Sequence, residues 1–310
     1  MIPTNSTHIP VLLTETIDLL NIKPNGIYVD CTAGLGGHSK VILDRLDQKG
    51  KLICIDQDQT AVDCLNKLFS SDKRVQTICK NFSELQSVMR DLQIVAVNGI
   101  LVDLGVSSPM FDDPTRGFSY HNDGPLDMRM NQNQKLDARF IVNNYDAKQL
   151  YDIFGYYGEI YNSKAVVNGI LEYRKHKSID TTLELVKIIK DSVPPAKLHE
   201  KKHPARNYFQ ALRIAVNDEL RNIKQLLKHA FDLLASQGRM AVISFHSLED
   251  RIVKHEFLRM SSSQIPKEVP IMNDTVNFEL ITKHPVVPTE AEIARNRRAR
   301  SAKLRVIERK

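Results

Sequence analysis

The chain has 310 residues, 42% of them hydrophobic and 26% charged, which is the composition of a globular protein with one large or two ordinary domains. No apolar run approaches the about 20 residues that a membrane helix requires, and the N-terminus lacks a basic start followed by a long apolar stretch. We therefore expect a cytoplasmic protein that does not contact the membrane.

The net charge of +6 is concentrated near the C-terminus, where residues 286–310 hold eight Lys or Arg against three Glu. Such a cluster attracts a phosphate backbone, although a merely solvated surface is an equally good interpretation. The four cysteines contain no CxxC pair, so we expect small buried thiols rather than disulfides or a metal site: Cys31, Cys54, Cys64 and Cys79.

Strand and helix patterns alternate in the first hundred residues. Short apolar runs predict strands at 26–32, 51–58, 74–82 and 97–108, and helical spacing connects them at 39–48 and 60–69. This alternation is typical of βαβ units and predicts a parallel, doubly wound sheet.

The alternation stops after the fourth strand. Residues 111–213 are polar and helical in pattern, with amphipathic segments at 148–158, 164–175 and 181–193. A long helix is expected at about 205–234, a strand at 238–247, and a final strand pair at 278–286 and 303–309, with Leu304 and Val306 buried and the neighbouring arginines outward. We predict one α/β domain formed by 1–110 and 214–310, interrupted by a helical insert at 111–213 that recognises the substrate.

A glycine turn, Gly34-Leu35-Gly36-Gly37-His38-Ser39, follows the first strand directly. Ser39 stands where a dinucleotide fingerprint needs its third glycine, and no GK[ST] follows, which argues against NAD and against a P-loop. Asp56 ends the second strand 20 residues after Gly36, where an acid accepts hydrogen bonds from ribose hydroxyls. The pattern favours S-adenosylmethionine, and a plain strand-to-helix turn is the alternative.

Two later segments point to the same edge of the sheet. Phe82 could stack on an adenine ring or be an ordinary core side chain. Asp103 ends the fourth strand, and Ser107 and Ser108 follow it, offering acceptors for the N–H groups of an exocyclic amine, or simply a capped turn. The chain has no Pro-Cys, so a cysteine nucleophile is not expected and direct transfer to nitrogen or oxygen is preferred.

The sequence resembles, nearly end to end, the RsmH or MraW family of bacterial methyltransferases that modify N4 of a cytidine in the decoding region of small-subunit (16S) ribosomal RNA. The segments that carry the resemblance include HIPVLL (8–13), GLGGHS (34–39), DLGVSSP (103–109), RGFSY (116–120), DGPLDMRM (123–130), FQALRIAVNDEL (209–220), ISFHSLEDRIVK (243–254) and RARSAKLR (298–305). It implies a Rossmann-like class I methyltransferase sheet, the cofactor S-adenosyl-L-methionine, and ribosomal RNA or the ribosomal subunit as partner, with the protein a monomer or homodimer.

The resemblance also implies site residues. Cofactor binding falls to Gly36, Gly37, His38, Asp56, Phe82, Asp103 and Met110, the last standing where the family often has a glutamine. From the residues themselves we expect Asp103, Ser107 and Ser108 to be catalytic, and we expect no metal. From their positions in the chain, Asp127 and Arg129 would belong to a lip over an extruded base, with a surface ion pair as the alternative. His246 and Asp250 follow the fifth strand and would lie at the ligand-facing edge, although a purely structural histidine is an equally good interpretation of His246.

Two other functions stay open from the residues alone. A DNA amino-methyltransferase would share the cofactor site. A non-catalytic RNA-binding or assembly factor would keep the fold, although the intact glycine turn, Asp56 and Asp103 argue against it.

Overall fold

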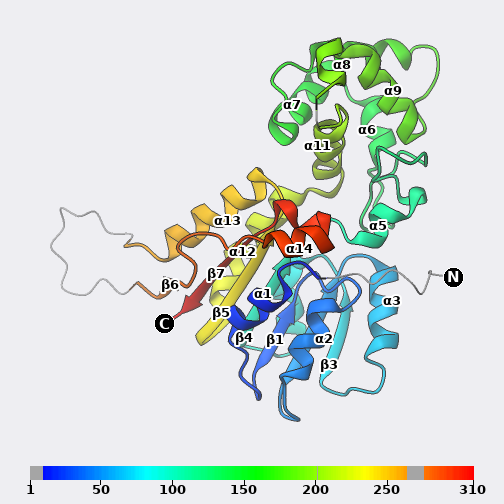
Figure 1. The fold of residues 1–310 in the computed structure, drawn as a ribbon. Coiled ribbons are helices and arrows are strands. Elements are labelled where there is room, and N and C mark those ends of the chain that lie inside the picture. Colours follow the sequence, from blue (N-terminus) through cyan, green and yellow to red (C-terminus); the bar gives the residue numbers. More distant parts are fainter. Residues whose placement is uncertain (1–9, 201, 264–275) are drawn as a thin grey trace. The chain divides into compact units, whose positions relative to one another are not determined.

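The computed structural model describes residues 10–200, 202–263 and 276–310 (Figure 1). The first two residues of the HIPVLL segment lie outside this range. The chain divides into two compact units, the first formed by 1–105 and 220–310 and the second by 106–219. These bounds fall a few residues outside the 111–213 segment identified in the sequence.

The first unit contains a seven-stranded sheet in the order β3-β2-β1-β4-β5-β7-β6. The first five strands are parallel, and β7 runs antiparallel to both β5 and β6. Strand order reverses between β1 and β4, which confirms the doubly wound fold. The strands are β1 (Ile27–Asp30), β2 (Lys51–Asp56), β3 (Val75–Cys79), β4 (Val97–Asp103), β5 (Leu234–Ser244), β6 (Phe278–Leu280) and β7 (Lys303–Arg309).

Helices cover both faces of this sheet, so its central strands are apolar on both sides (Figure 1). One core lies under α1 (Leu13–Leu20), α2 (Gly37–Asp44) and α3 (Gln59–Leu68). The other core lies under α4 (Leu85–Asp91), α12 (Glu219–Leu233) and α13 (Ser247–Met260). Before β7 come α14 (Glu290–Arg295) and a 3₁₀ turn at Arg297–Ser301.

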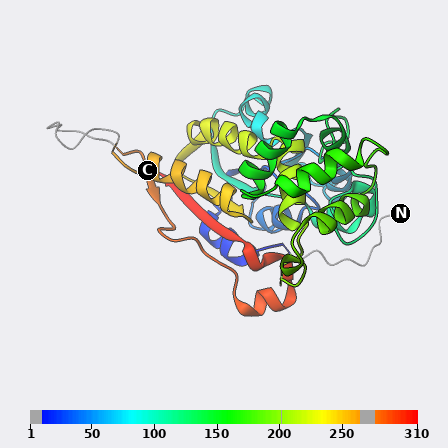
Figure 2. The same cartoon turned by 90° about the horizontal axis from the view of Figure 1, so that it is seen from above.

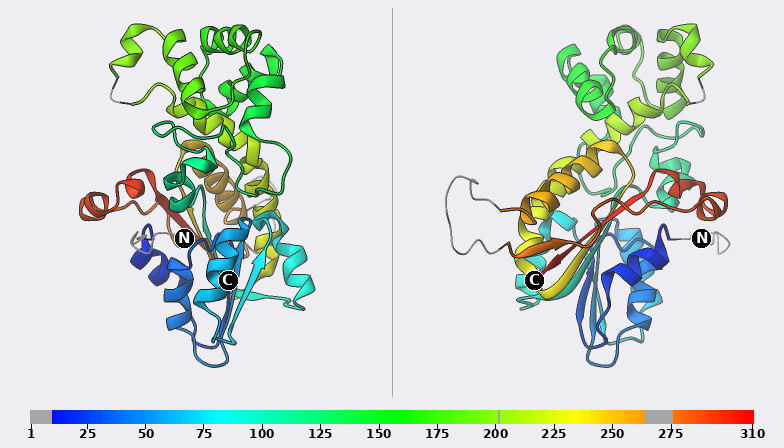
Figure 3. Two further views of the ribbon diagram at one scale, coloured as in Figure 1. Left: turned by 90° about the vertical axis from the view of Figure 1, so that its right-hand side faces the viewer. Right: turned by 60° about the vertical axis from the view of Figure 1, so that its left-hand side comes forward.

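The expected final strand pair is present, but its side-chain pattern differs from the prediction. β7 lies between β5 and β6, and its run beside β5 can be followed in Figure 3. Leu304 and Val306 are buried as expected, whereas the outward placement of Arg305 is wrong, since only 8% of it is exposed. Its Nε donates to Oδ1 of Asp250 at 2.7 Å, so an ion pair satisfies the charge inside the protein.

The second unit is helical, as expected, and its helices gather around one apolar core (Figure 2, green). The three amphipathic segments form α7 (Ala147–Gly158), α8 (Lys164–Tyr173) and α9 (Thr182–Ser192). The described part of this unit has no strand, only an isolated bridge between Pro125 and Thr181. The remaining helices are α5 (Ser108–Asp112), α6 (Ala138–Asn144), α10 (Pro195–Leu198) and α11 (Arg206–Asn217), with a 3₁₀ turn at Pro114–Arg116.

The expected long helix at 205–234 is instead two helices. Asp218 adopts a left-handed backbone with φ of 49° and separates α11 from α12. Just before it, the buried Asn217 side chain accepts from the N–H of Met130 and donates to the carbonyl of Met128, both at 2.8 Å. A tertiary contact therefore fixes the end of α11, where the sequence has neither glycine nor proline.

Two smaller expectations also need correction. The strand expected at 278–286 ends at Leu280, although Val286 bridges to Leu304. Cys31 and Cys54 are buried as expected, but Cys64 is only partly buried, and Cys79 at the end of the edge strand β3 is exposed. Within the part of the chain that is described, no helix is both long enough and apolar enough to cross a membrane.

Candidate active site

Three neighbouring strands each end in an aspartate at the carboxyl edge of the sheet. Asp30 ends β1, Asp56 ends β2 and Asp103 ends β4. In parallel strands these ends meet at one edge, beside the point where strand order reverses. This is where a doubly wound sheet binds its ligand.

The glycine turn reaches directly to Asp56. Gly34 and Gly36 have φ of 52° and 82°, values that favour glycine, and a Cβ on Gly36 would lie 2.7 Å from Leu68 Cδ2. The N–H of Gly34 donates to Asp56 Oδ2 at 2.8 Å, and the N–H of Asp58 donates to Oδ1 at 2.9 Å. Each carboxylate oxygen has a second lone pair, so Asp56 can also accept from a ligand hydroxyl.

Gly37 and His38 face the N-terminal segment. A Cβ on Gly37 would lie 2.4 Å from Pro10 Cγ, so this glycine allows close packing. The buried His38 ring places Nε2 3.1 Å from the Val11 carbonyl and Nδ1 3.9 Å from Asp103 Oδ2. The His38 side chain therefore contacts Asp103, and cofactor binding by these two residues remains a prediction.

Asp103 holds an incompletely satisfied carboxyl. Its backbone N–H donates to Thr32 Oγ1 at 2.6 Å, but its buried Oδ1 has no hydrogen-bond partner among the described residues. Burial, followed by the charges of Asp30 and Glu249, raises the pKa of Asp103 well above its ordinary value. A buried polar atom without a partner costs free energy, so a ligand that supplies a donor or a positive charge would be favoured here.

Asp30 is a site residue that we did not assign from the sequence. It accepts from Ser39 Oγ at 2.6 Å, and burial raises its pKa to about 6 despite that bond. Burial likewise raises the pKa of Asp56 to about 6. The signal for Asp30 was available, because the sequence places an acid in the first predicted strand, four residues before Gly34.

Phe82 begins a 3₁₀ turn (Phe82–Glu84) after β3 and packs partly buried against the core under α4 and α12. Asn81 caps this turn through Ser83 N–H and donates to Gln57 Oε1 at 2.7 Å. Core packing is one of the two interpretations of Phe82, and the stacking interpretation is untested.

The remaining catalytic candidates belong to the second unit. Ser107 precedes α5 without capping it through its side chain, and Ser108 is half-buried. Met110 is buried in the apolar core of that unit. Their proposed roles stay predictions.

Asp127 and Arg129 form the ion pair that we gave as the alternative to a lip. Arg129 donates to both oxygens of Asp127, at 2.9 and 2.7 Å, and to the carbonyls of Gln132 and Gln134. These bonds hold the backbone of the segment, and the lip role is untested.

His246 and Asp250 lie at the start of α13. His246 is the N-cap, with Nε2 3.0 Å from Glu249 Oε1. Asp250 binds Arg305 and Lys303, so its carboxylate is used within the fold.

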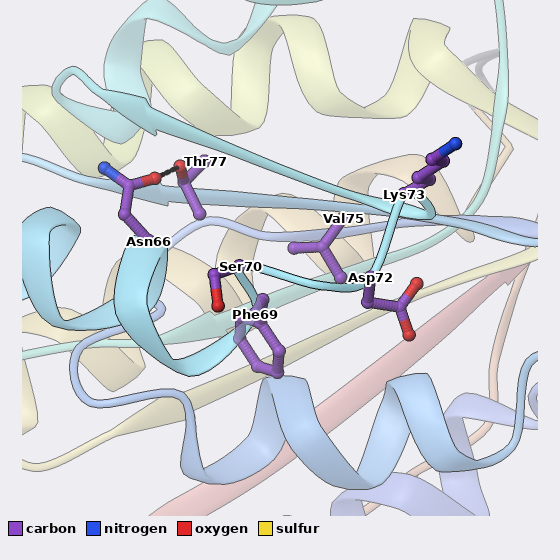
Figure 4. A pocket seen from close by; sticks show the side chains of 7 residues that line it. All are labelled: Asn66, Phe69, Ser70, Asp72, Lys73, Val75 and Thr77. Carbon is purple, nitrogen blue, oxygen red and sulfur yellow. Dashed lines mark hydrogen bonds between the residues drawn. The ribbon is translucent and has the colours of Figure 1, made fainter.

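A separate hollow opens beside the edge strand β3, lined by Asn66, Phe69, Ser70, Asp72, Lys73, Val75 and Thr77 (Figure 4). Val75 pairs with Leu52, near the start of β2, whereas Asp56 ends that strand. The hollow thus lies away from the carboxyl edge and contributes nothing to the site.

The chain matches the model of the MraW methylase family over residues 5–310. It is 53% identical over 298 residues to "Ribosomal RNA small subunit methyltransferase H" of Ureaplasma urealyticum serovar 10, covering 96% of each chain. The protein of the same name from Ureaplasma parvum serovar 3 is 52% identical, again over 96% of each chain. A solved structure of a putative rRNA-methylase from Clostridium thermocellum aligns with a TM-score of 0.46 and 12% identity, covering 98% of this chain and all of that one.

Proposed function

The chain belongs to the MraW methylase family, and from this premise we propose that it transfers a methyl group from S-adenosylmethionine to small-subunit ribosomal RNA. The acceptor we propose is N4 of a cytidine in the decoding region. The observation that carries the proposal is the buried, unpartnered Oδ1 of Asp103 at the edge where Asp56 and the glycine turn meet.

The residues at this edge fit the cofactor. Asp56 keeps free lone pairs for ribose hydroxyls, and Asp103 offers an acceptor to a donor group. S-adenosylmethionine, when bound, supplies an electrophilic methyl group on a positively charged sulfur. Three carboxyls with raised pKa values suit such a cation, since a nearby positive charge favours their ionised form.

In the methyl transfer, residues of this chain would make the exocyclic amine of the cytidine more nucleophilic. The lone pair of an exocyclic amine is conjugated with the ring, and acceptors on its N–H groups favour the pyramidal, nucleophilic form. We propose that Ser107, Ser108 and nearby backbone carbonyls are these acceptors. We also place Asp103 among the catalytic residues. We assign substrate recognition to the helical insert.

Mass mapping of methylated nucleosides in ribosomal RNA from a strain lacking the protein tests the proposal. We expect loss of one N4-methylated cytidine, and its return when purified protein and S-adenosylmethionine are added to that RNA or subunit. Unchanged nucleosides would overturn the assignment, and methylation of DNA instead of RNA would favour the DNA amino-methyltransferase.

A further inference from the structure

A cluster of aromatic and histidine rings lies on the second unit, where Tyr120 packs against the edge of the apolar core. The Tyr120 and His203 rings stack with centroids 4.9 Å apart and an interplanar angle of 18°, and His121 lies 4.5 Å from Tyr120. Tyr120 and His203 are half-buried and His121 is exposed. Flat π faces that reach the surface are what an unpaired nucleic-acid base stacks on.

The loop that carries Tyr120 and His121 is held at both ends. Arg116 is buried and donates to the carbonyls of Arg129 and Met130, both at 3.0 Å. At the other end, Thr182 donates from its hydroxyl to the Asn122 carbonyl and from its N–H to the Gly124 carbonyl, both at 2.9 Å. The rings are therefore pre-organised, which lowers the entropic cost of binding.

The His203 ring is fixed in one form. Its Nδ1 accepts from the N–H of Ala205 at 3.2 Å, which requires an unprotonated Nδ1. Burial, followed by the charges of Lys190 and His121, lowers the pKa of His203 and so favours the neutral ring. A neutral imidazole parallel to a phenol ring offers a stacking surface rather than an ion-pair partner.

Cations accompany the rings. Lys190 at the end of α9 is exposed, and its charge contributes to the lowered pKa of His203. Lys202, which directly precedes His203 in the chain, is exposed as well. Stacking rings beside lysines are the combination with which proteins bind single-stranded nucleic acid. Because this inference concerns the RNA substrate, it rests on the proposed function.

We propose that Tyr120, His121 and His203 form a stacking platform for an unpaired base of the RNA substrate, with Lys190 and Lys202 at its phosphates. If Tyr120 only packed on the buried Phe209, the rings would not need to reach the surface. A role in stacking on a base accounts for their surface position.

The absence of tryptophan from the sequence allows a direct test. Tyr120→Trp makes a single indole reporter, and Tyr161→Trp, at a tyrosine 91% exposed on the same unit, is its control. Both are titrated with a short single-stranded RNA of the decoding-region sequence that the unaltered protein binds. We expect quenching at position 120 only, weaker with a duplex of equal length and absent with S-adenosylmethionine alone. If the fluorescence of Trp at position 120 is not quenched when RNA is bound, or if S-adenosylmethionine alone quenches it, the proposed platform is wrong.

Affinity provides the second measurement. Tyr120→Leu and the exposed His121→Ala should each weaken RNA binding, the former by about 5- to 100-fold, with an unchanged salt slope, while Tyr120→Phe and Tyr161→Leu retain it. If both His121→Ala and a folded Tyr120→Leu bind normally, the platform is wrong. If the wild type binds this RNA and the Tyr120→Trp reporter is quenched, but the wild type transfers no methyl group, the proposed function is overturned instead.

Discussion

The backbone N–H of Gly34 donates to Oδ2 of Asp56 at 2.8 Å and so joins the turn after β1 to the end of β2. Together with the bond from the Asp58 N–H to Oδ1, it fixes the carboxylate beside the turn, so two segments separated in the chain lie side by side. It leaves Asp56 oriented, partly buried and still able to accept from a ligand.

Asp56→Ala should weaken binding of S-adenosylmethionine by about 1–3 kcal/mol, because the ribose hydroxyls lose an ionised acceptor. Isothermal titration calorimetry measures the change, and Asp63→Ala, an exposed acid on α3, is the control. If the folded Asp56→Ala protein binds S-adenosylmethionine with wild-type affinity, Asp56 does not belong to the cofactor site.

The pH dependence of stability and of cofactor affinity should run in opposite directions. Burial raises the pKa of Asp30 and Asp56 to about 6, so below that pH the folded protein keeps protons that the unfolded chain releases. These two groups therefore make the cofactor-free protein more stable as pH falls from 7 towards 4.

The same protonation removes negative charge that attracts a cation, so the dissociation constant for S-adenosylmethionine should rise by about tenfold between pH 7 and pH 5. Calorimetry across that range checks it, with the folded Asp56→Asn variant expected to show a flatter profile. An affinity independent of pH would contradict the assignment of these carboxyls to the cation.

Ser107→Ala combined with Ser108→Ala should lower the methyl-transfer rate by roughly 10²-fold and leave cofactor affinity unchanged, because the hydroxyls serve the amine. Single-turnover kinetics on ribosomal RNA separates the two effects. Full activity of the double variant would show that Ser107 and Ser108 only form a turn and do not take part in methyl transfer.

Asp250→Ala should destabilise the protein by about 3–5 kcal/mol, because it leaves Arg305 buried without its partner. Burial raises the pKa of Asp250, but the bonds from Arg305 and Lys303 outweigh it and hold the pKa below its ordinary value. This stability is complete above the ordinary pKa and is lost as pH falls through the lower, folded value. Denaturant unfolding measures it, and Asp250→Leu with Arg305→Met should cost less than Asp250→Ala.

Arg298→Ala with Arg300→Ala should weaken RNA binding without loss of the cofactor. Both side chains are exposed, whereas Lys303 and Arg305 are bound to Asp250. Removing an arginine that neutralises one RNA phosphate lowers the slope of log affinity against log salt by roughly 0.7–0.9 in magnitude. Lys49→Ala with Lys51→Ala is the matched control. An unaltered salt slope in the variant that lacks Arg298 and Arg300 would show that these arginines do not bind RNA and only form a solvated surface.

The sequence was sufficient for the order and type of most elements, because β1 to β4 alternate with helices in apolar runs that periodicity detects. It was insufficient where a contact between residues far apart in the chain determines the local structure. Arg305 is buried because Asp250 lies opposite it on α13, and α11 ends because Asn217 binds the backbone of Met128 and Met130. The positions of Asp56 and Asp103 at strand ends were predictable, but the unpartnered oxygen of Asp103 depends on packing that no local pattern contains.

The insertion of β7 between β5 and β6 has a consequence for biosynthesis. β5 ends at Ser244, and the strand that completes its hydrogen bonding begins only at Lys303. While the nascent chain emerges, Met240 to Ile243 therefore present an apolar, unpaired edge to other chains. A chain interrupted before residue 303 would keep that edge open, so premature termination near the C-terminus should yield aggregates rather than a shortened, active protein.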